Sequence, residues 1–139
     1  MEPLSKGYEH HEVEAKWYPI WRDKKYFKTD NVSDKEPFCI VIPSSNVTGV
    51  LHMGHALTFA IQDAMVRFAR MEGKNTLWLP GTDHAGIATQ MVVERELAKE
   101  GVSRFDLGRE KFLAEVWRWK DKSHARITKQ MTALGVSVD

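Results

Sequence analysis

Two short apolar runs and the helical segment between them form the most regular part of the chain. Residues 38–42 are all apolar and lack polar alternation, which is typical of a strand buried on both faces of a parallel sheet. Residues 76–79 form a second run that ends at a Pro-Gly pair, which favours another short strand. From about Leu51 to Gly73 the apolar residues repeat at helical spacing. This order predicts a βαβ unit with parallel strands.

The helix predicted between these strands has an apolar stripe and a polar side. An amphipathic helix that packs on a sheet normally turns its apolar stripe inward. We therefore expect the stripe to face the sheet and the polar side to face away from it. The stripe consists of Leu57, Ala60, Ile61, Ala64, Met65 and Phe68, and the polar side consists of Gln62, Asp63, Arg67 and Arg70.

A segment rich in aromatic residues precedes the first strand. Its apolar side chains fall at helical spacing over residues 12–27, which predicts a short helix that docks on the main body through its tryptophans. Residues 28–37 are polar and turn-prone, as is typical of a connector. We therefore divide the chain into a helical arm with its connector, residues 1–36, and a main domain, residues 37–139.

Two further helical patterns follow the βαβ unit. Residues 85–100 and 110–134 are predicted to be helices, and Ser103 and Asp106 are candidate N-caps. Residues 136–138 have the character of a strand that is just beginning. Together with the βαβ unit, these elements predict an α/β fold with a parallel sheet.

Composition narrows the classes of function. The chain has 20 Lys and Arg against 19 Asp and Glu, and the formal net charge of +1 gives no chain-wide attraction for nucleic acid. The single cysteine, Cys39, excludes a disulfide within the chain and a zinc site built on several cysteines, and its apolar surroundings predict burial. No apolar stretch is long enough to span a bilayer and no signal-peptide pattern is present, so we expect a cytoplasmic protein without a membrane partner.

The segment between the first strand and the helix carries the candidate chemistry. It lies where open α/β sheets bind ligands, and it places His52 and His55, three residues apart, on the first helical turn. Two imidazole donors and the N-terminal end of a helix can stabilise phosphate oxygens as pyrophosphate leaves. Gly54 between them has no side chain, so an adenine ring can rest against the backbone. A metal-binding pair, a pH-sensitive cap and ordinary surface histidines are the alternatives.

Two motifs resemble signatures of a known family. The sequence His-Met-Gly-His at 52–55 is similar to the ATP signature of class I aminoacyl-tRNA synthetases. The sequence Asn-Val-Thr-Gly at 46–49 and the stretch 81–90 resemble the valine-specific branch. Isoleucine and leucine relatives usually carry a Trp-Asp pair where Thr82 and Asp83 stand. The resemblance covers almost the whole chain and implies the first half of a Rossmann-like parallel-sheet nucleotide-binding fold, preceded by the helical arm.

The resemblance also implies roles for individual residues. His52 and His55 would be the catalytic residues that stabilise the phosphates, and Gly54 would pack under the adenine ring. Asp83 would pair with the α-ammonium group of the amino acid. The alternative role for Asp83 is an N-cap of the next helix, and the two roles are compatible. The expected ATP-binding residues are Thr48, Gly49, His52, Gly54 and His55, and the expected amino-acid-binding residues are Pro43, Ser44, Asn46 and Asp83.

By the same resemblance, the parent enzyme activates L-valine with ATP to valyl-adenylate and transfers it to tRNA(Val). Mg²⁺ would accompany ATP, while the chain itself is expected to hold no metal. The lysine-rich second signature, the editing insertion and the anticodon-binding region of the family are absent from the sequence. We therefore expect a truncated piece of the enzyme that is weak or inactive alone, does not bind tRNA, and self-associates through its open sheet edge. A non-catalytic folding module, an isoleucine- or leucine-type synthetase and another nucleotidyltransferase with paired histidines are the alternatives.

One segment departs from the family pattern. Ser44 and Ser45 follow Pro43 where the family usually shows a run of prolines. Proline fixes φ and removes an N–H, whereas two serines add hydroxyls, backbone donors and conformational freedom. We therefore expect weaker valine binding and less discrimination against threonine.

Overall fold

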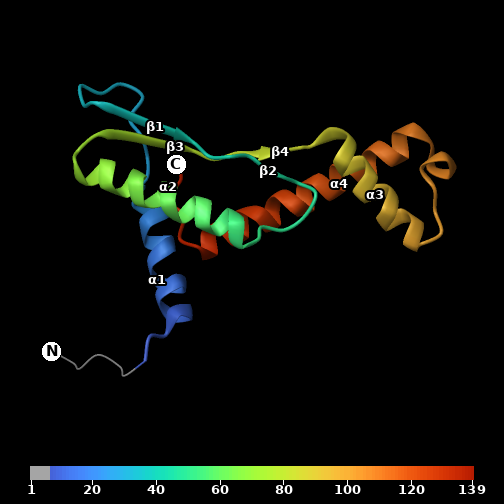
Figure 1. The fold of residues 1–139 in the computed structure, drawn as a ribbon, viewed down its shortest axis with the longest axis horizontal. Coiled ribbons are helices and arrows are strands. Elements are labelled where there is room, and N and C mark those ends of the chain that lie inside the picture. The colour runs from blue at the N-terminus through green and yellow to red at the C-terminus, as the bar shows by residue number, and fades with distance from the viewer. Residues whose placement is uncertain (1–6) are drawn as a thin grey trace.

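The computed structural model of the protein describes residues 7–139, so residues 1–6 of the predicted arm lie outside the described part. The strands lie side by side along the molecule, α2 runs beside them, α1 projects from one end, and α3 and α4 extend towards the other (Figure 1). None of the helices within residues 7–139 combines the length and apolarity needed to cross a membrane. The helices are α1 His10–Asp23, α2 Met53–Met71, α3 Gly86–Lys99 and α4 Arg104–Ala133, and the strands are β1 Pro37–Val41, β2 Ser45–Asn46, β3 Asn75–Leu79 and β4 Thr82–Asp83.

The predicted βαβ unit is confirmed. β1 and β3 pair in parallel, with Phe38 opposite Thr76 and Ile40 opposite Trp78, and α2 forms the crossover. The pairing continues beyond the first ladder, because β2 and β4 also pair in parallel. The backbone that follows the first strand is therefore partly held in a second ladder, whereas the sequence had indicated only a loop there.

The prediction that β1 is buried on both faces is wrong. Phe38 and Ile40 are partly buried and pack against the core, whereas Cys39 and Val41 are exposed. The expected burial of Cys39 is wrong for the same reason. Within residues 7–139, the packed helices cover only one face of this strand, so its side chains alternate between the core and solvent.

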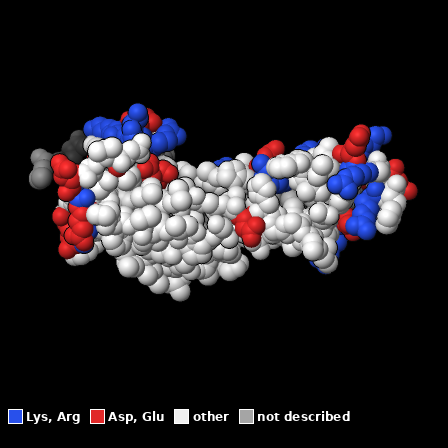
Figure 2. Space-filling model, turned by 90° about the horizontal axis from the view of Figure 1, so that it is seen from above, with Lys and Arg blue, Asp and Glu red and all other residues white. Residues whose placement is uncertain are grey.

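The face of α2 that meets the core is also the opposite of the predicted one. Phe59, Val66 and Ala69 are buried, and Phe59 and Val66 belong to the main core cluster. The larger residues of the predicted inward stripe are exposed, and Leu57 retains 64% of its accessible surface. In Figure 2, charged side chains gather at the two ends of the molecule, and the surface between them is mostly uncharged apart from a few charged residues near the middle. The exposed members of the predicted stripe are Leu57, Ala60, Ile61, Ala64, Met65 and Phe68.

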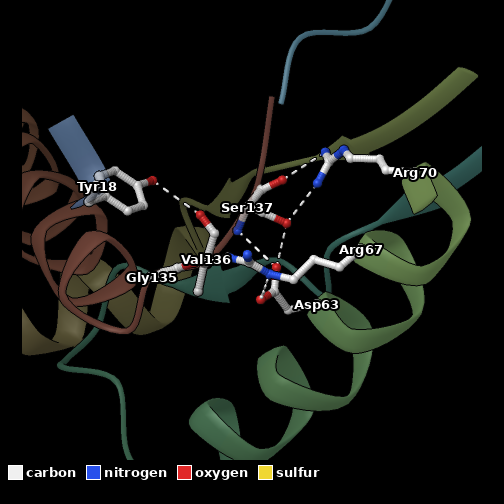
Figure 3. Close-up of polar contacts among 7 residues, drawn as sticks. All are labelled: Tyr18, Asp63, Arg67, Arg70, Gly135, Val136 and Ser137. Atoms are coloured by element: carbon white, nitrogen blue, oxygen red, sulfur yellow. Dashed lines mark hydrogen bonds and ion pairs between the residues drawn. The ribbon is translucent and has the colours of Figure 1, made fainter. Parts of the chain in front are cut away.

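The polar side of α2 binds the last segment of the chain, which explains this orientation. Asp63 accepts a hydrogen bond from the Ser137 backbone N–H at 3.0 Å. Arg67 donates to the Gly135 carbonyl at 2.8 Å, and Arg70 donates to the Ser137 carbonyl at 2.8 Å (Figure 3). Because Ser137 is fully buried, these bonds satisfy backbone groups that water cannot reach. The expectation that Asp63, Arg67 and Arg70 face away from the core is wrong.

The same segment contacts both the sheet and the arm. The Asp139 N–H donates to the Trp78 carbonyl at 3.2 Å, so the segment approaches β3, although residues 136–138 do not form a strand. The Tyr18 hydroxyl of α1 donates to the Val136 carbonyl at 3.1 Å. The Arg67 guanidinium lies 5.2 Å from the Trp21 ring centre. The arm therefore docks through Tyr18 and Trp21.

The downstream helices agree with the predicted ones apart from one boundary. Ser103 is the N-cap of α4, as predicted, whereas the prediction of Asp106 as an N-cap is wrong. The Asp106 carboxylate instead accepts from the Ser103 N–H and completes a capping box. α4 therefore begins at Arg104, earlier than predicted, and a left-handed Gly108 with φ 72° interrupts its first turns. Further along α4, Ile127 and Met131 pack into the core.

Candidate functional site

A cavity of about 360 Å³ lies between the end of β1, the β2 strand and the start of α2. Its wall contains every residue that the sequence assigned to the site except Gly54 and Asp83. The chain therefore brings the expected phosphate-binding and amino-acid-binding residues around one cavity. The lining residues are Pro43, Ser44, Ser45, Asn46, Thr48, Gly49, Val50, Leu51, His52 and His55.

His52 and His55 form a capping box at the start of α2. His52 is the N-cap, and its Nδ1 accepts from the Gly54 N–H at 3.1 Å. The His52 N–H in turn donates to Nδ1 of His55 at 3.2 Å. A ring nitrogen that accepts a hydrogen bond carries no proton, so the proton of each neutral ring is on Nε2. The capping box therefore leaves both rings with an Nε2–H donor for a ligand.

The two rings also influence each other's charge. Their centroids are 4.0 Å apart, with an interplanar angle of 55°. The pKa of His55 is lowered from its ordinary value, first because partial burial disfavours the charged ring and second because His52 lies beside it. The neutral form of His55 is favoured as a result. The two histidines therefore cap the helix in a way that depends on the protonation of His55, as the alternative of a pH-sensitive cap supposes. This role is compatible with phosphate binding.

Acidification is expected to weaken this cap. The folded-state pKa of His55 lies below its ordinary value of 6.5, so the unfolded chain binds more protons in the window between the two values. The stability that depends on neutral His55 is therefore fully present above pH 6.5 and is lost as the pH falls through the lowered pKa. Melting temperatures of the wild type and His55→Gln across this window should converge on acidification. An NMR titration of His55 with a midpoint at or above its ordinary value would contradict the expectation.

Gly54 lies close to the His52 ring. A Cβ at residue 54 would lie 3.0 Å from Cε1 and 3.1 Å from Nδ1 of His52, which is tighter than ordinary contact. The sequence had associated Gly54 with the adenine ring only. The structure adds a second reason for glycine at this position, because a larger residue shifts the His52 ring by a few tenths of an ångström.

Asp83 lies next to the cavity wall at the end of β4. It stands opposite Asn46 in the parallel ladder, so the stretch that begins at residue 81 lies beside the Asn-Val-Thr-Gly segment at 46–49. One oxygen of its exposed carboxylate accepts from the Ala85 N–H at 2.8 Å. The N-cap alternative for Asp83 is wrong, because Ala85, in a left-handed conformation, occupies the N-cap position of α3. Asp83 instead holds the turn that precedes that helix.

Comparison with known protein families decides the family. The profile described as tRNA synthetases class I (I, L, M and V) matches residues 16–139. The chain belongs to the class I tRNA synthetase family. The predicted family resemblance is therefore confirmed, and it covers all but the first residues of this synthetase chain.

Curated relatives of this synthetase chain are similar over its whole length. Valine–tRNA ligase of Fusobacterium nucleatum is 57% identical over 139 residues, which are 100% of this chain and 16% of that protein. The ligase of Syntrophotalea carbinolica is 59% identical over 140 residues, again 100% of this chain and 16% of the relative. The ligase of Acinetobacter baylyi is 60% identical over 136 residues, which are 98% of this chain and 14% of that protein. The chain thus spans about a sixth of the length of these relatives.

A solved structure supports the fold. The LeuRS of Agrobacterium radiobacter, determined in a ternary complex with tRNA and LeuAMS, superposes with a TM-score of 0.76. The match covers 95% of this chain and 15% of that one, at 20% identity. The predicted α/β, Rossmann-like architecture of this synthetase chain is therefore confirmed.

Of the two serines that stand where the family usually has prolines, Ser45 is buried and Ser44 is exposed. Ser45 is buried in β2 and stands opposite Thr82 in the ladder, which fixes its backbone. The hydroxyl of Ser44 lies 3.3 Å from the position that a Cβ on Gly81 would occupy. The expected conformational freedom is thus restricted at Ser45, while the expected loss of valine selectivity stays a prediction.

Two residues that contact the site of this synthetase chain were not found from the sequence. The indole N–H of Trp119 donates to the Val47 carbonyl at 2.9 Å, across 72 positions of sequence. The side chain of Gln130 accepts from the Leu51 N–H at 3.0 Å, across 79 positions. Both residues lie on α4, where the local pattern indicates only a partly buried helix face, so only the tertiary structure brings them to the loop.

Proposed function

We propose that the full-length synthetase activates L-valine with ATP to form valyl-adenylate and transfers the valyl group to tRNA(Val). The paired Nε2–H donors of His52 and His55 at the wall of one cavity carry this proposal. The chain-long similarity to proteins named valine–tRNA ligase, at 57% and 59% identity, supports valine as the amino acid. The cavity also contains Asn46 and Ser44 of the proposed amino-acid site.

The chemistry follows from the groups around the cavity. The carboxylate of valine attacks the α-phosphorus of ATP, a new oxygen–phosphorus bond forms, and the bond to the leaving pyrophosphate breaks. Negative charge grows on phosphate oxygens during this step, and His52 and His55 donate to these oxygens from Nε2. The N-terminal end of α2 adds its positive dipole end. Such preorganised donors stabilise the transition state without having to reorient during the reaction.

The remaining residues bind the two substrates. Thr48 and Gly49 line the cavity wall where the phosphates would lie. Gly54 is not part of that wall, and the adenine ring would lie against its backbone, which has no side chain. Asp83 retains acceptor capacity after its bond to the Ala85 N–H, so its carboxylate can pair with the α-ammonium group of valine. Its position opposite Asn46 supports this assignment.

The partners follow from the same proposal. Mg²⁺ enters with ATP, and within residues 7–139 no cluster of three or more His, Cys, Asp or Glu side chains could hold a metal ion. We assign tRNA(Val) binding to the full-length protein, because this chain has a net charge of only +1. A role in protein synthesis supports a cytoplasmic location. Among residues 7–139, β1 pairs with β3 only, and this free strand edge and the exposed apolar side chains of α2 support self-association of the isolated chain.

The test is amino-acid-dependent ATP–pyrophosphate exchange in the full-length protein. Valine should support exchange, whereas isoleucine and leucine should support it far less. A preference for isoleucine or leucine would favour the alternative synthetase types, and exchange that needs no amino acid would favour another nucleotidyltransferase. For the 139-residue chain alone, calorimetric titration with ATP distinguishes a nucleotide-binding unit from a non-catalytic folding module.

A further inference from the structure

One helix holds both ends of the loop that leads into the paired histidines. At the first end, the indole of Trp119 donates to the Val47 carbonyl at 2.9 Å. At the second end, the amide of Gln130 binds both backbone groups of Leu51: it accepts from the N–H at 3.0 Å and donates to the carbonyl at 3.4 Å. All three bonds are partly buried. They fix the backbone on either side of residues 48–50.

α4 presents both hydrogen-bonding side chains to the loop from one face. Trp119 and Gln130 are separated by eleven positions, which is three helical turns and places them on one face of α4, about 16 Å apart along its axis. Between them, Ser123 and Ile127 are buried on the same side of the helix. α4 therefore presents one rigid face to the loop, with a hydrogen-bonding side chain at each end of that face.

The held segment contributes directly to the cavity. Thr48, Gly49 and Val50 line it, and Leu51 is the residue before the N-cap His52. The His52 backbone N–H donates to the ring of His55, so the backbone path through Leu51 determines where both imidazoles lie. A shift of the Leu51 peptide would move the His52–His55 capping box relative to Thr48 and Gly49, which line the cavity.

We propose that Trp119 and Gln130 are positioning residues of the nucleotide site. They hold the 47–51 loop from both ends. The loop residues that line the cavity therefore keep a fixed position relative to the two imidazole donors. This inference rests on the proposed function in so far as ATP is the ligand. The stability of the fold can be changed separately, because Val93 of α3 is buried but does not belong to the core cluster that contains Val47 and packs against Leu51.

The test compares loop-bond variants with a packing variant in the full-length protein. Gln130→Leu removes both bonds to Leu51, and Trp119→Phe removes the indole N–H together with part of the ring volume. We expect either change to raise the KM for ATP or lower the kcat of valine-dependent exchange by about tenfold, because small misplacements of reacting groups have large kinetic effects. Gln130→Glu keeps an acceptor for the Leu51 N–H and should restore part of the loss.

Two controls separate positioning from stability. Val93→Ala weakens packing on α3 by roughly 2 kcal/mol and should lower the melting temperature while leaving the KM for ATP unchanged. Lys129→Leu changes an exposed neighbour of Gln130 and should change neither. The inference is overturned if Gln130→Leu and Trp119→Phe leave KM and kcat as they are in Val93→Ala, whatever their melting temperatures.

A direct measurement of ATP binding keeps the two proposals distinguishable. If the wild type shows no valine-dependent exchange, the proposed function fails. In that case, weaker calorimetric binding of ATP by Gln130→Leu than by Lys129→Leu still supports the positioning role, and equal binding by the two variants overturns it.

Discussion

Replacing His52 and His55 together by alanine is expected to lower the kcat of valine-dependent ATP–pyrophosphate exchange by at least roughly 10²- to 10³-fold. Both rings line the cavity, and both offer an Nε2–H because their Nδ1 atoms are engaged within the capping box. Removal of one preorganised donor typically lowers a rate by about 10²- to 10³-fold. Since the two rings act as a unit, the double change is expected to cost less than the product of the single changes.

Two comparisons show whether this loss is chemical. Alanine at the N-cap also weakens the helix by about 1 kcal/mol, so His52→Asn is needed, because asparagine caps well but lacks the imidazole donor. It should lose activity at nearly unchanged melting temperature. His10→Ala with His11→Ala removes another pair of adjacent rings, 3.9 Å apart on the exposed arm, and should leave exchange intact. Exchange that survives the His52 and His55 double change would refute the assigned role.

Gly54→Ala is expected to lower kcat/KM for exchange by roughly 10- to 100-fold without destabilising the fold. The added Cβ would meet the His52 ring at 3.0 Å, so the ring must move and its bond from the Gly54 N–H must weaken. Alanine is also the better helix former by about 1 kcal/mol, and residue 54 lies in the first turn of α2. Activity should therefore fall while the melting temperature stays constant or rises.

The opposite substitution on the same helix provides the control. Ala60→Gly lies on the exposed side of α2 and removes helix propensity without touching either imidazole. It should lower the melting temperature and leave kcat/KM unchanged. Wild-type kinetics in Gly54→Ala would mean that the position of the His52 ring does not matter, and the proposed use of that ring would have to be abandoned.

Several features could be predicted from the sequence because their determinants are local. Continuous apolar runs and helical spacing identified the strand–helix–strand unit, which the parallel pairing of β1 with β3 confirms. Ser103 was recognisable as a candidate N-cap from its residue type and its place before a helical pattern, whereas the sequence analysis did not recognise Asp106 as its partner. The approximate place of the site was also predictable, since the carboxyl end of a parallel strand and the start of the next helix are adjacent in both sequence and space.

The tertiary structure alone decided how these elements face one another. α2 has apolar residues on both sides, so periodicity could not show that Phe59 and Val66 turn inward while Leu57 and Phe68 turn outward. That choice depends on Asp63, Arg67 and Arg70 binding the segment around Ser137, roughly seventy positions away.

The arrangement of the site has the same origin. The sequence by itself predicted most residues of the proposed nucleotide site, because one continuous segment contains them. Which nitrogen of each imidazole remains available depends on the capping box, and the shape of the loop depends on Trp119 and Gln130 of a distant helix. Bonds between segments so far apart in the chain leave no periodic pattern in the sequence, because only folding brings their partners together.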